Sequence, residues 1–227
     1  MGGGGFAVHH QRGRAADVFD RPWPAPALRT VWFVEVDRPT LVLGSTQPDA
    51  LVDRARATAA GVDVVRRHSG GGAVLLRPGE TAWVDVLLPA GDPLSVADVG
   101  LAFAWLGRVW ARALAAVGVA GAVHVHEGAP RPPTPWSAAV CFAGLGPGEV
   151  TVEGAKVVGI SQRRRRAGAL FQCGALVTWA PGPLVDLLAL ADDEREAAGE
   201  GLAGVAAGAG VDPGRLASAF EGALYSA

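Results

Sequence analysis

The residue most suited to chemistry is a lysine that stands alone. The chain has 227 residues, and its 20 basic residues are nineteen arginines and Lys156. An ammonium group is a compact point charge that fits where a planar guanidinium does not. A lysine kept in so arginine-rich a chain suggests a role that arginine does not fill. Composition alone leaves open a lysine retained by chance on a solvated strand.

Lys156 lies in a segment that alternates like a strand, residues 156–164. Gly159 in its interior indicates that another group packs close to the backbone there. Gly154 and Ala155 form a short turn just before it. Strict alternation puts Lys156, Val158 and Ile160 on one face of this strand and Val157, Gly159 and Ser161 on the other.

A second candidate is the glycine-rich loop between two expected strands. It reads Arg66-Arg67-His68-Ser69-Gly70-Gly71-Gly72-Ala73-Val74. Consecutive glycines cost conformational entropy, so they are typical of places where backbone approaches a ligand closely. The two arginines add cations beside loop amides, a combination suited to an anion. The loop is neither a Walker loop nor a dinucleotide fingerprint, because no Gly-Lys-Ser/Thr follows and a strand rather than a helix comes next. A wide turn without function is the plain alternative.

The two cysteines, Cys141 and Cys173, are too few for a disulfide framework. Thiolates near cations are activated nucleophiles, and the glycine loop and Lys156 would bring cations to Cys141. A buried cysteine without chemistry is the alternative. Cys173, on an alternating strand, is the weaker candidate.

His124 and His126 share a strand face, but without a third ligand nearby we expect no metal site.

Charge and hydropathy exclude several classes of partner. The net charge is −2, which gives no sign of nucleic-acid or anionic-membrane binding. No apolar run approaches the roughly 20 residues that span a bilayer. The N-terminus lacks a signal-peptide pattern, so we expect a cytoplasmic protein with reduced thiols. Arg163–Arg166 form a basic run, either a solvated strand end or a docking patch for an acidic partner.

These residues must be positioned by an α+β domain. Residues 1–27 predict an irregular N-terminal arm, and 28–227 a single catalytic domain without an accessory domain. Strands are expected at 31–36, 41–44, 62–67, 122–127, 139–143, 149–153 and 169–179, and as a hairpin or meander of 73–76 and 81–88. Helices are expected at 49–60 and 95–117, the latter capped by Ser95, and as short helices after Pro183. The prediction is a mixed, largely antiparallel sheet flanked by helices.

Three segments together resemble the lipoate–protein ligase and octanoyltransferase family, which shares its catalytic domain with biotin ligases. Arg66–Val74 matches that family's Arg-Arg-x-x-Gly-Gly-Gly-Ala-Val loop. Residues 154–163 match its Gly-x-Lys-(Ile/Val)-x-Gly-x-(Ala/Ser)-Gln-Arg segment, and Gly44-Ser45-Thr46-Gln47 match its Gly-x-x-Gln element. The segments occur in the family's order, and the resemblance covers about residues 31–190.

The resemblance implies a biotin/lipoate ligase-like, class II synthetase-like fold. It implies that Lys156 holds an acyl carbonyl or the phosphate of an acyl-adenylate. It further implies a product amide on a lysine of a lipoyl domain, in a 2-oxoacid dehydrogenase subunit or a glycine cleavage H protein. The implied substrate-binding residues are Gly44, Gln47, Arg66, Arg67, Ser69, Gly70, Gly71, Gly72, Ala73, Val158, Gly159 and Ser161.

The chain departs from the family pattern in ways that bear on the route. Ligases usually continue the loop with His-Asp-x-Gly-Asn, where this chain has residues 75–81, and their later His-Gly is Cys173-Gly174 here. Many bacterial ligases carry an accessory domain, although some relatives use a separate subunit. The lost Asp and Asn weaken the case for ATP and Mg²⁺. Conversely, Cys141-Phe142 resembles octanoyltransferases that carry the acyl group as a cysteine thioester.

Three hypotheses follow. The leading one is a ligase that uses ATP, Mg²⁺ and lipoate or octanoate through an acyl-adenylate. The second is a cofactor-independent transfer from acyl carrier protein with Cys141 as nucleophile. The third is a degenerate relative that binds an acyl group or adenylate without turnover. Biotin is the least expected substrate, because the biotin-type loop is absent where Arg66–Val74 stands.

Overall fold

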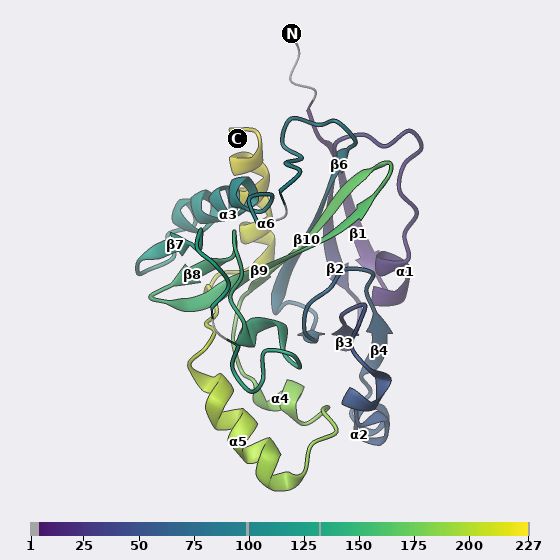
Figure 1. Cartoon of the computed structure of the whole chain (residues 1–227), viewed down its shortest axis with the longest axis vertical. Coiled ribbons are helices and arrows are strands. Elements are labelled where there is room, and N and C mark those ends of the chain that lie inside the picture. Colours follow the sequence, from purple (N-terminus) through teal and green to yellow (C-terminus); the bar gives the residue numbers. More distant parts are fainter. Residues whose placement is uncertain (1–4, 99, 132, 227) are drawn as a thin grey trace.

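The computed structural model describes residues 5–98, 100–131 and 133–226 (Figure 1). A seven-stranded sheet and a three-stranded sheet are flanked by helices, which confirms the predicted α+β class. Among the described residues, no helix has both the length and the apolar character needed to cross a membrane.

The large sheet buries both faces along its central strands. Apolar residues alternate between two core clusters, so that Val31 and Phe33 face one cluster while Trp32 and Val34 face the other. β1 pairs with β2 in parallel, and the other neighbouring pairs are antiparallel. The strand order is β1 (Ala7–Gly13), β2 (Thr30–Val36), β6 (Thr81–Pro89), β10 (Gly168–Leu176), β9 (Ala155–Arg165), β8 (Val150–Val152) and β7 (Val123–Val125).

Two helices cover the first face of this sheet, α3 (Ala104–Ala116) and α6 (Pro213–Leu224). The ring centroids of Trp110 on α3 and Phe220 on α6 lie 4.5 Å apart. Asp212 caps α6 by accepting a hydrogen bond from the Arg215 amide. Figure 1 shows the two helices side by side against the sheet.

The second face is covered by the small sheet, whose order is β4 (Asp63–Arg66), β3 (Thr40–Leu43) and β5 (Val74–Leu76). Val42 and Val74 of this sheet share a core cluster with Trp32 and Trp83 of the large one. The glycine loop joins β4, which ends at Arg66, to β5, which begins at Val74. Its Ser69 contacts Gln172 and Ser161 of the large sheet, so the loop lies at the junction between the two sheets.

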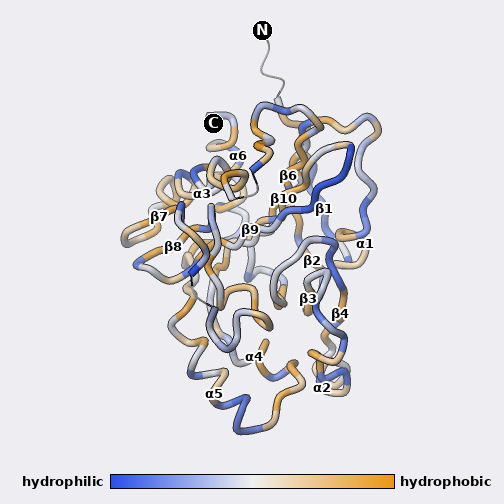
Figure 2. The backbone as a smooth tube through the Cα atoms, in the orientation of Figure 1, coloured by the Kyte–Doolittle hydropathy of each residue, from blue (hydrophilic) through white to orange (hydrophobic). Residues whose placement is uncertain are grey.

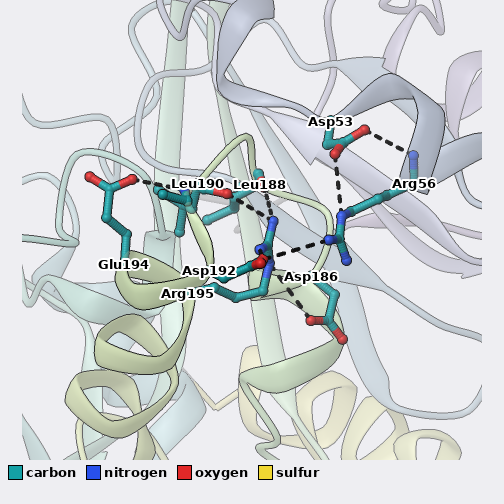
Figure 3. A network of polar contacts seen from close by, with 9 residues as sticks. Asp53, Arg56, Asp186, Leu188, Leu190, Asp192, Glu194 and Arg195 are labelled. Atoms are coloured by element: carbon teal, nitrogen blue, oxygen red, sulfur yellow. Dashed lines mark hydrogen bonds and ion pairs between the residues drawn. The ribbon is translucent and has the colours of Figure 1, made fainter.

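Peripheral helices close the far side of the small sheet. They are η1 (Asp49–Leu51), α2 (Arg54–Ala59), α4 (Gly182–Val185) and α5 (Asp192–Ala203). Arg195 on α5 donates to the carbonyl oxygens of Leu188 and Leu190 and pairs with Asp192 at 2.8 Å (Figure 3). Asp192 also lies 3.9 Å from the Arg56 guanidinium, which ties α5 to α2.

The N-terminal region is more regular than predicted. Residues 7–13 of the expected irregular arm form β1, and Ala15–Phe19 form the short helix α1. His9 and His10 stack on Trp32 and Phe33 of β2, at centroid distances of 5.9 Å and 5.1 Å. β1 has no apolar alternation, because backbone pairing with β2 rather than burial of its side chains defines it.

Three further predictions need correction. The expected hairpin of 73–76 and 81–88 does not form: β5 pairs with β3, whereas β6 pairs with β2 and β10. The helix at 49–60 is broken, because Val52 is extended and bridges to Leu188. The helix at 95–117 begins only at Ala104, and Ser95 lies in a turn instead of capping it.

The expected strand at 139–143 is also wrong. Val140 forms a single bridge to Ala73, and Cys141–Ala143 then turn as the 3-10 helix η2. Phe142 turns into the core between the two sheets. This turn, rather than a strand, presents Cys141.

Candidate active site

A β-bulge determines where Lys156 points. In the β8–β9 pair, Val150 lies opposite Val158 and Thr151 opposite Lys156, so Val157 is an extra residue. Val157 and Val158 both face the core beneath α3 and α6. The predicted face of Lys156 is therefore wrong, because its side chain shares a face with Gly159 instead of Val158. The bulge brings Lys156 to the junction of the two sheets.

The Lys156 ammonium is buried and fully engaged. Its side chain is 3% exposed, and Nζ lies 2.7 Å from Oε2 of Glu149. Nζ also donates to the carbonyl oxygens of Cys141 and Gly144, each at 2.9 Å. An ammonium has three donor hydrogens, and these acceptors match them in number. Lys156 thus braces the turn that carries Cys141.

Glu149 is a site residue that the sequence analysis missed. Besides Lys156, its carboxylate accepts from the Gly146 amide at 2.7 Å and the Ile160 amide at 3.1 Å. The buried ion pair is thus fully hydrogen-bonded, the condition under which burying two charges is tolerated. A glutamate after Gly-Pro-Gly gives no local signal of such a pairing.

Cys141 lies at the wall of a narrow pocket and is partly exposed. Its amide donates to the Ala73 carbonyl at 3.0 Å, so the backbone around the thiol is held from both sides. Burial lowers the pKa of Arg67, while the nearby Cys141 acts in the opposite direction. The thiol therefore lies within electrostatic reach of the Arg67 guanidinium.

The two loop arginines hold backbone rather than face outward. Arg67 is buried and donates to the carbonyl oxygens of Gly70 and Gly72 at 2.8 and 2.9 Å. Arg66 donates to the carbonyl oxygens of Gly44 and Gln47 at 2.8 and 2.6 Å. The two arginines therefore fix the backbone of the glycine loop and of the segment 44–47. Their spacing in the sequence did not indicate this structural role.

Two glycines allow backbones to meet at this junction. A Cβ on Gly44 would lie 1.9 Å from the Gly71 carbonyl oxygen, and one on Gly72 would lie 2.5 Å from the Cys141 amide nitrogen. Gln47 completes the contact, because its amide nitrogen donates to the Ala138 carbonyl oxygen at 2.8 Å. The predicted loop residues thus converge on the turn before Cys141.

Ser69 and Ser161 form the polar floor of the site. Ser161 donates to the Ser69 hydroxyl at 3.0 Å, and Ser69 donates to Oε1 of Gln172 at 2.7 Å. Gln172, on β10, was not among the predicted residues. Its position in a strand whose alternate residues are apolar was the available signal.

Two adjoining pockets meet at this point. The narrow pocket includes Cys141, Phe142, Gly159, Ser161 and Gln172 in its lining. Through Val74 and Phe142 it borders an outer pocket, whose lining includes Arg77, Glu80 and Thr81.

Some predicted residues lie elsewhere. Val158 faces the core beneath α3 and α6, away from the pocket. Cys173 is completely buried in that same core, and burial strongly raises the pKa of its thiol. A thiol so buried does not ionise readily, which removes Cys173 as a nucleophile. His126 contacts the Ala129 carbonyl oxygen at 2.8 Å, and the described residues contain no cluster of three potential metal ligands.

The basic run Arg163–Arg166 lies at the end of the β9–β10 hairpin, a strongly hydrophilic stretch in Figure 2. Arg164 donates to the carbonyl oxygens of Val96 and Ala97 at 2.7 and 2.8 Å. Arg165 lies 4.9 Å from the Trp23 ring centroid. At least these two arginines therefore have intramolecular contacts, and docking of an acidic partner stays a prediction.

Comparisons with known proteins agree with this architecture. A bipartite lipoate protein ligase from Thermoplasma acidophilum, studied with its E2 lipoyl domain, superposes with a TM-score of 0.74 at 14% identity, covering 97% of this chain and 82% of that one. A lipoate-protein ligase A bound with ATP gives a TM-score of 0.70 at 15% identity, covering 97% and 84%. LipL1 of P. falciparum with lipoate gives 0.61 at 11% identity, covering 97% and 60%.

These structural likenesses concern the fold. No curated protein sequence matches the chain at a significant level. The family model of the lipoyl protein ligase A/B catalytic domain matches residues 23–209. That span contains the glycine loop, the Cys141 turn and the bulged Lys156 strand. The chain therefore belongs to the lipoyl protein ligase A/B catalytic domain family.

Proposed function

We propose that this protein transfers a lipoyl-type acyl group, such as octanoyl, to a lysine of a lipoyl domain through a thioester on Cys141. The observation that carries the proposal is the turn 141–144, which holds a partly exposed thiol at the wall of the narrow pocket while Lys156 braces its backbone. The acceptor class is supported by the family and by the archaeal ligase studied with its E2 lipoyl domain.

The structure changes the order of preference that the sequence suggested. The sequence favoured an acyl-adenylate, with Lys156 contacting the activated acyl group. In the folded chain the ammonium is already matched by Glu149 and two carbonyl oxygens. Arg66 and Arg67 are likewise engaged with backbone. These contacts leave Cys141 as the reactive group best presented to the pocket.

The proposed chemistry has two balanced steps. The Cys141 thiolate attacks the carbonyl carbon of an acyl thioester on acyl carrier protein; a new C–S bond forms and the donor thiol leaves. The neutral amine of the acceptor lysine then attacks the enzyme thioester, an amide forms, and Cys141 is released as a thiol. The buried Arg67 guanidinium lies within electrostatic reach of the sulfur that attacks in the first step.

Intact-mass spectrometry after mixing with octanoyl acyl carrier protein tests the first step. We expect an adduct of one octanoyl group that is absent in Cys141→Ser and present in the matched control Cys173→Ala. Loss of the adduct on addition of a lipoyl domain, with acylation of that domain, tests the second step. An unmodified protein, or an adduct that survives Cys141→Ser, would refute the thioester route.

A ligase acting through an acyl-adenylate is the second candidate. The outer pocket favours it, because it adjoins the narrow pocket and is lined by Arg77, Glu80 and Thr81, the region that follows the glycine loop. The Arg77 guanidinium and the Glu80 carboxylate pair with each other at 3.3 Å; on binding ATP the first would face a phosphate and the second would offer an oxygen to Mg²⁺. When bound, ATP would activate the acyl carboxyl group for transfer.

Release of pyrophosphate from ATP in the presence of lipoate or octanoate measures this alternative directly. Under the thioester proposal we expect none, with or without a lipoyl domain. Pyrophosphate release that persists in Cys141→Ser would establish the ligase in its place. Absence of both activities, with retained fatty-acid binding, would identify a relative that binds without turnover.

A further inference from the structure

A polar row crosses the second face of the large sheet. In the strand register, Trp32 lies opposite Asp85, Asp85 opposite Gln172, and Gln172 opposite Ser161. The row therefore runs across β2, β6, β10 and β9. The neighbouring row, two residues along each strand, contains Trp83, Gly174 and Gly159.

The row is fixed by hydrogen bonds from both sides. Asp85 is fully buried; Trp83 donates to its Oδ1 at 2.8 Å, and Nε2 of Gln172 lies 3.4 Å from the same oxygen. Oδ2 pairs with the Arg21 guanidinium at 2.5 Å. From above, Ser69 of the glycine loop donates to Oε1 of Gln172. The Gln172 side chain is therefore held in place at both ends of its amide.

Two pockets lie on opposite sides of this row. The narrow pocket lies over the glycine row, where Trp83 packs against Gly174 and Phe142 against Gly159, and Cys141 forms part of the wall. The second lies beneath α1 and is lined by Phe19, Trp23 and Leu170 together with the polar side chains of Arg21, His68, Asp85 and Arg163. Gln172 lines both pockets. Its amide thus stands between the space beside Cys141 and a space beyond that has both aromatic and charged walls.

We propose that Gln172, locked by Asp85 and Ser69, determines the maximum length of the acyl chain. A chain joined to Cys141 extends over Gly159 and Gly174 until its methyl end meets the Gln172 amide. Successive rows on one face are about 6.8 Å apart, so the row limits the chain within a few methylenes. The substrate class is an unbranched saturated acyl group, because the narrow pocket is lined largely by apolar side chains, among them Val74, Phe142 and Ile160.

The inference rests on the proposed function for the reacting end of the chain, but one of the two assays in its test, the binding of free fatty acids, does not. Removing the side chain in Gln172→Ala joins the two pockets. Gln172→Met is the matched control, because it keeps nearly the same length without the amide. Near-ultraviolet circular dichroism and thermal unfolding establish that each variant is folded before it is used.

The experiment measures two chain-length profiles for acyl chains of four to twelve carbons. One is acylation of Cys141 by acyl carrier protein thioesters, read by intact mass; the other is calorimetric binding of the free fatty acids to Cys141→Ser. In Gln172→Ala we expect the preferred length to increase by at least two carbons, with at least a 10-fold gain for chains beyond the wild-type limit. Gln172→Met should keep the wild-type profile.

The outcomes separate the two proposals. A folded Gln172→Ala variant with an unchanged profile in both assays overturns the inference. An equal shift in Gln172→Met also overturns it, because the side chain's length would then be irrelevant. Shifted binding without acylation of Cys141 supports the chain-length limit and refutes the thioester route instead.

Discussion

At the residue scale, the lone lysine is explained by the number and direction of its partners. Glu149, the Cys141 carbonyl and the Gly144 carbonyl surround one ammonium within 2.9 Å. A guanidinium is planar and presents its five N–H groups as a rigid fork, so it does not reproduce this arrangement. The Phe142 ring centroid, 5.1 Å from Nζ, leaves little room for a larger head group.

Lys156→Arg is therefore expected to abolish acyl transfer while the domain stays folded. The larger group displaces the turn 141–144, and a misplacement of about 1 Å costs on the order of 100-fold in rate. Acylation of Cys141 by intact mass and thermal unfolding measure the two effects. The control is Arg108→Lys, which also exchanges arginine and lysine but at an exposed position, and it should leave both the acylation rate and the thermal stability unchanged. Normal turnover by Lys156→Arg would mean that the lysine persisted by chance.

A second prediction concerns the glycine loop. Gly72→Ala forces a Cβ to within 2.5 Å of the backbone at Val140 and Cys141, which must then move. Overpacking of this kind costs about 1–3 kcal/mol. Gly70→Ala is the matched control, because a Cβ there meets nothing within 4 Å. Chemical denaturation should show a loss of stability, and acylation a loss of rate, in Gly72→Ala alone; equal effects in both variants would contradict the packing argument.

At the element scale, the N-terminal segment is secured by a charge. Arg21, which follows α1, pairs with the buried Asp85 and lies 4.2 Å from the Trp32 ring centroid. Val18 and Phe19 of α1 pack in the core between the sheets. The segment that looked irregular in the sequence is therefore part of the domain and covers one end of the polar row.

Arg21→Ala is expected to destabilise the fold by about 3–5 kcal/mol, because it leaves the buried Asp85, whose pKa burial already raises, without its cation. The double variant Arg21→Ala/Asp85→Asn removes that uncompensated charge and should recover part of the loss. Denaturant unfolding of the two variants and of the wild type gives the comparison. A double variant no more stable than Arg21→Ala would show that packing of Arg21, and not charge, holds the segment.

At the scale of the whole molecule, one ion pair links the start of β2 to the turn after β6. Arg29 donates to both carboxylate oxygens of Asp92, at 2.6 and 2.9 Å. Burial by itself raises the pKa of Asp92, but the hydrogen bonds from Arg29 and Leu94 outweigh it and the pKa is lowered. The pair therefore stabilises the fold above the unfolded pKa of about 3.9, and this contribution is lost as pH falls through the lower folded value.

Asp92→Asn should accordingly destabilise the protein at pH 7, by about 1.5–3 kcal/mol for hydrogen bonds to a charged group. The difference from wild type should shrink as pH falls from about 5 toward 2. Thermal unfolding across this range measures it, and Asp98→Asn, at an exposed carboxylate of the same loop, is the control. A difference that stays constant with pH would exclude ionisation of Asp92 as the cause.

Much of this molecule is determined by local sequence patterns. Runs of apolar and β-branched residues located β2, β6 and β9 to within one residue at each end, because strands buried on both faces are apolar along their length, and they located β10 to within three residues. The glycine loop, the odd lysine and the Gly-x-x-Gln element identified the family, because close backbone approach leaves glycine as the residue that fits. Among the regions that local pattern misjudged, β1 is one in which backbone pairing rather than side-chain burial sets the structure.

The tertiary structure decided what the key residues do. The face of Lys156 depends on a bulge, and a single extra residue in a strand pair leaves no trace in the alternation of that strand. Glu149, Gln172 and Asp85 became parts of the site through strand register and loop packing between residues far apart in the chain. These contacts are hydrogen bonds and ion pairs between different strands and loops. The sequence therefore determines which side chains are available for chemistry, and the tertiary structure determines which of them meet.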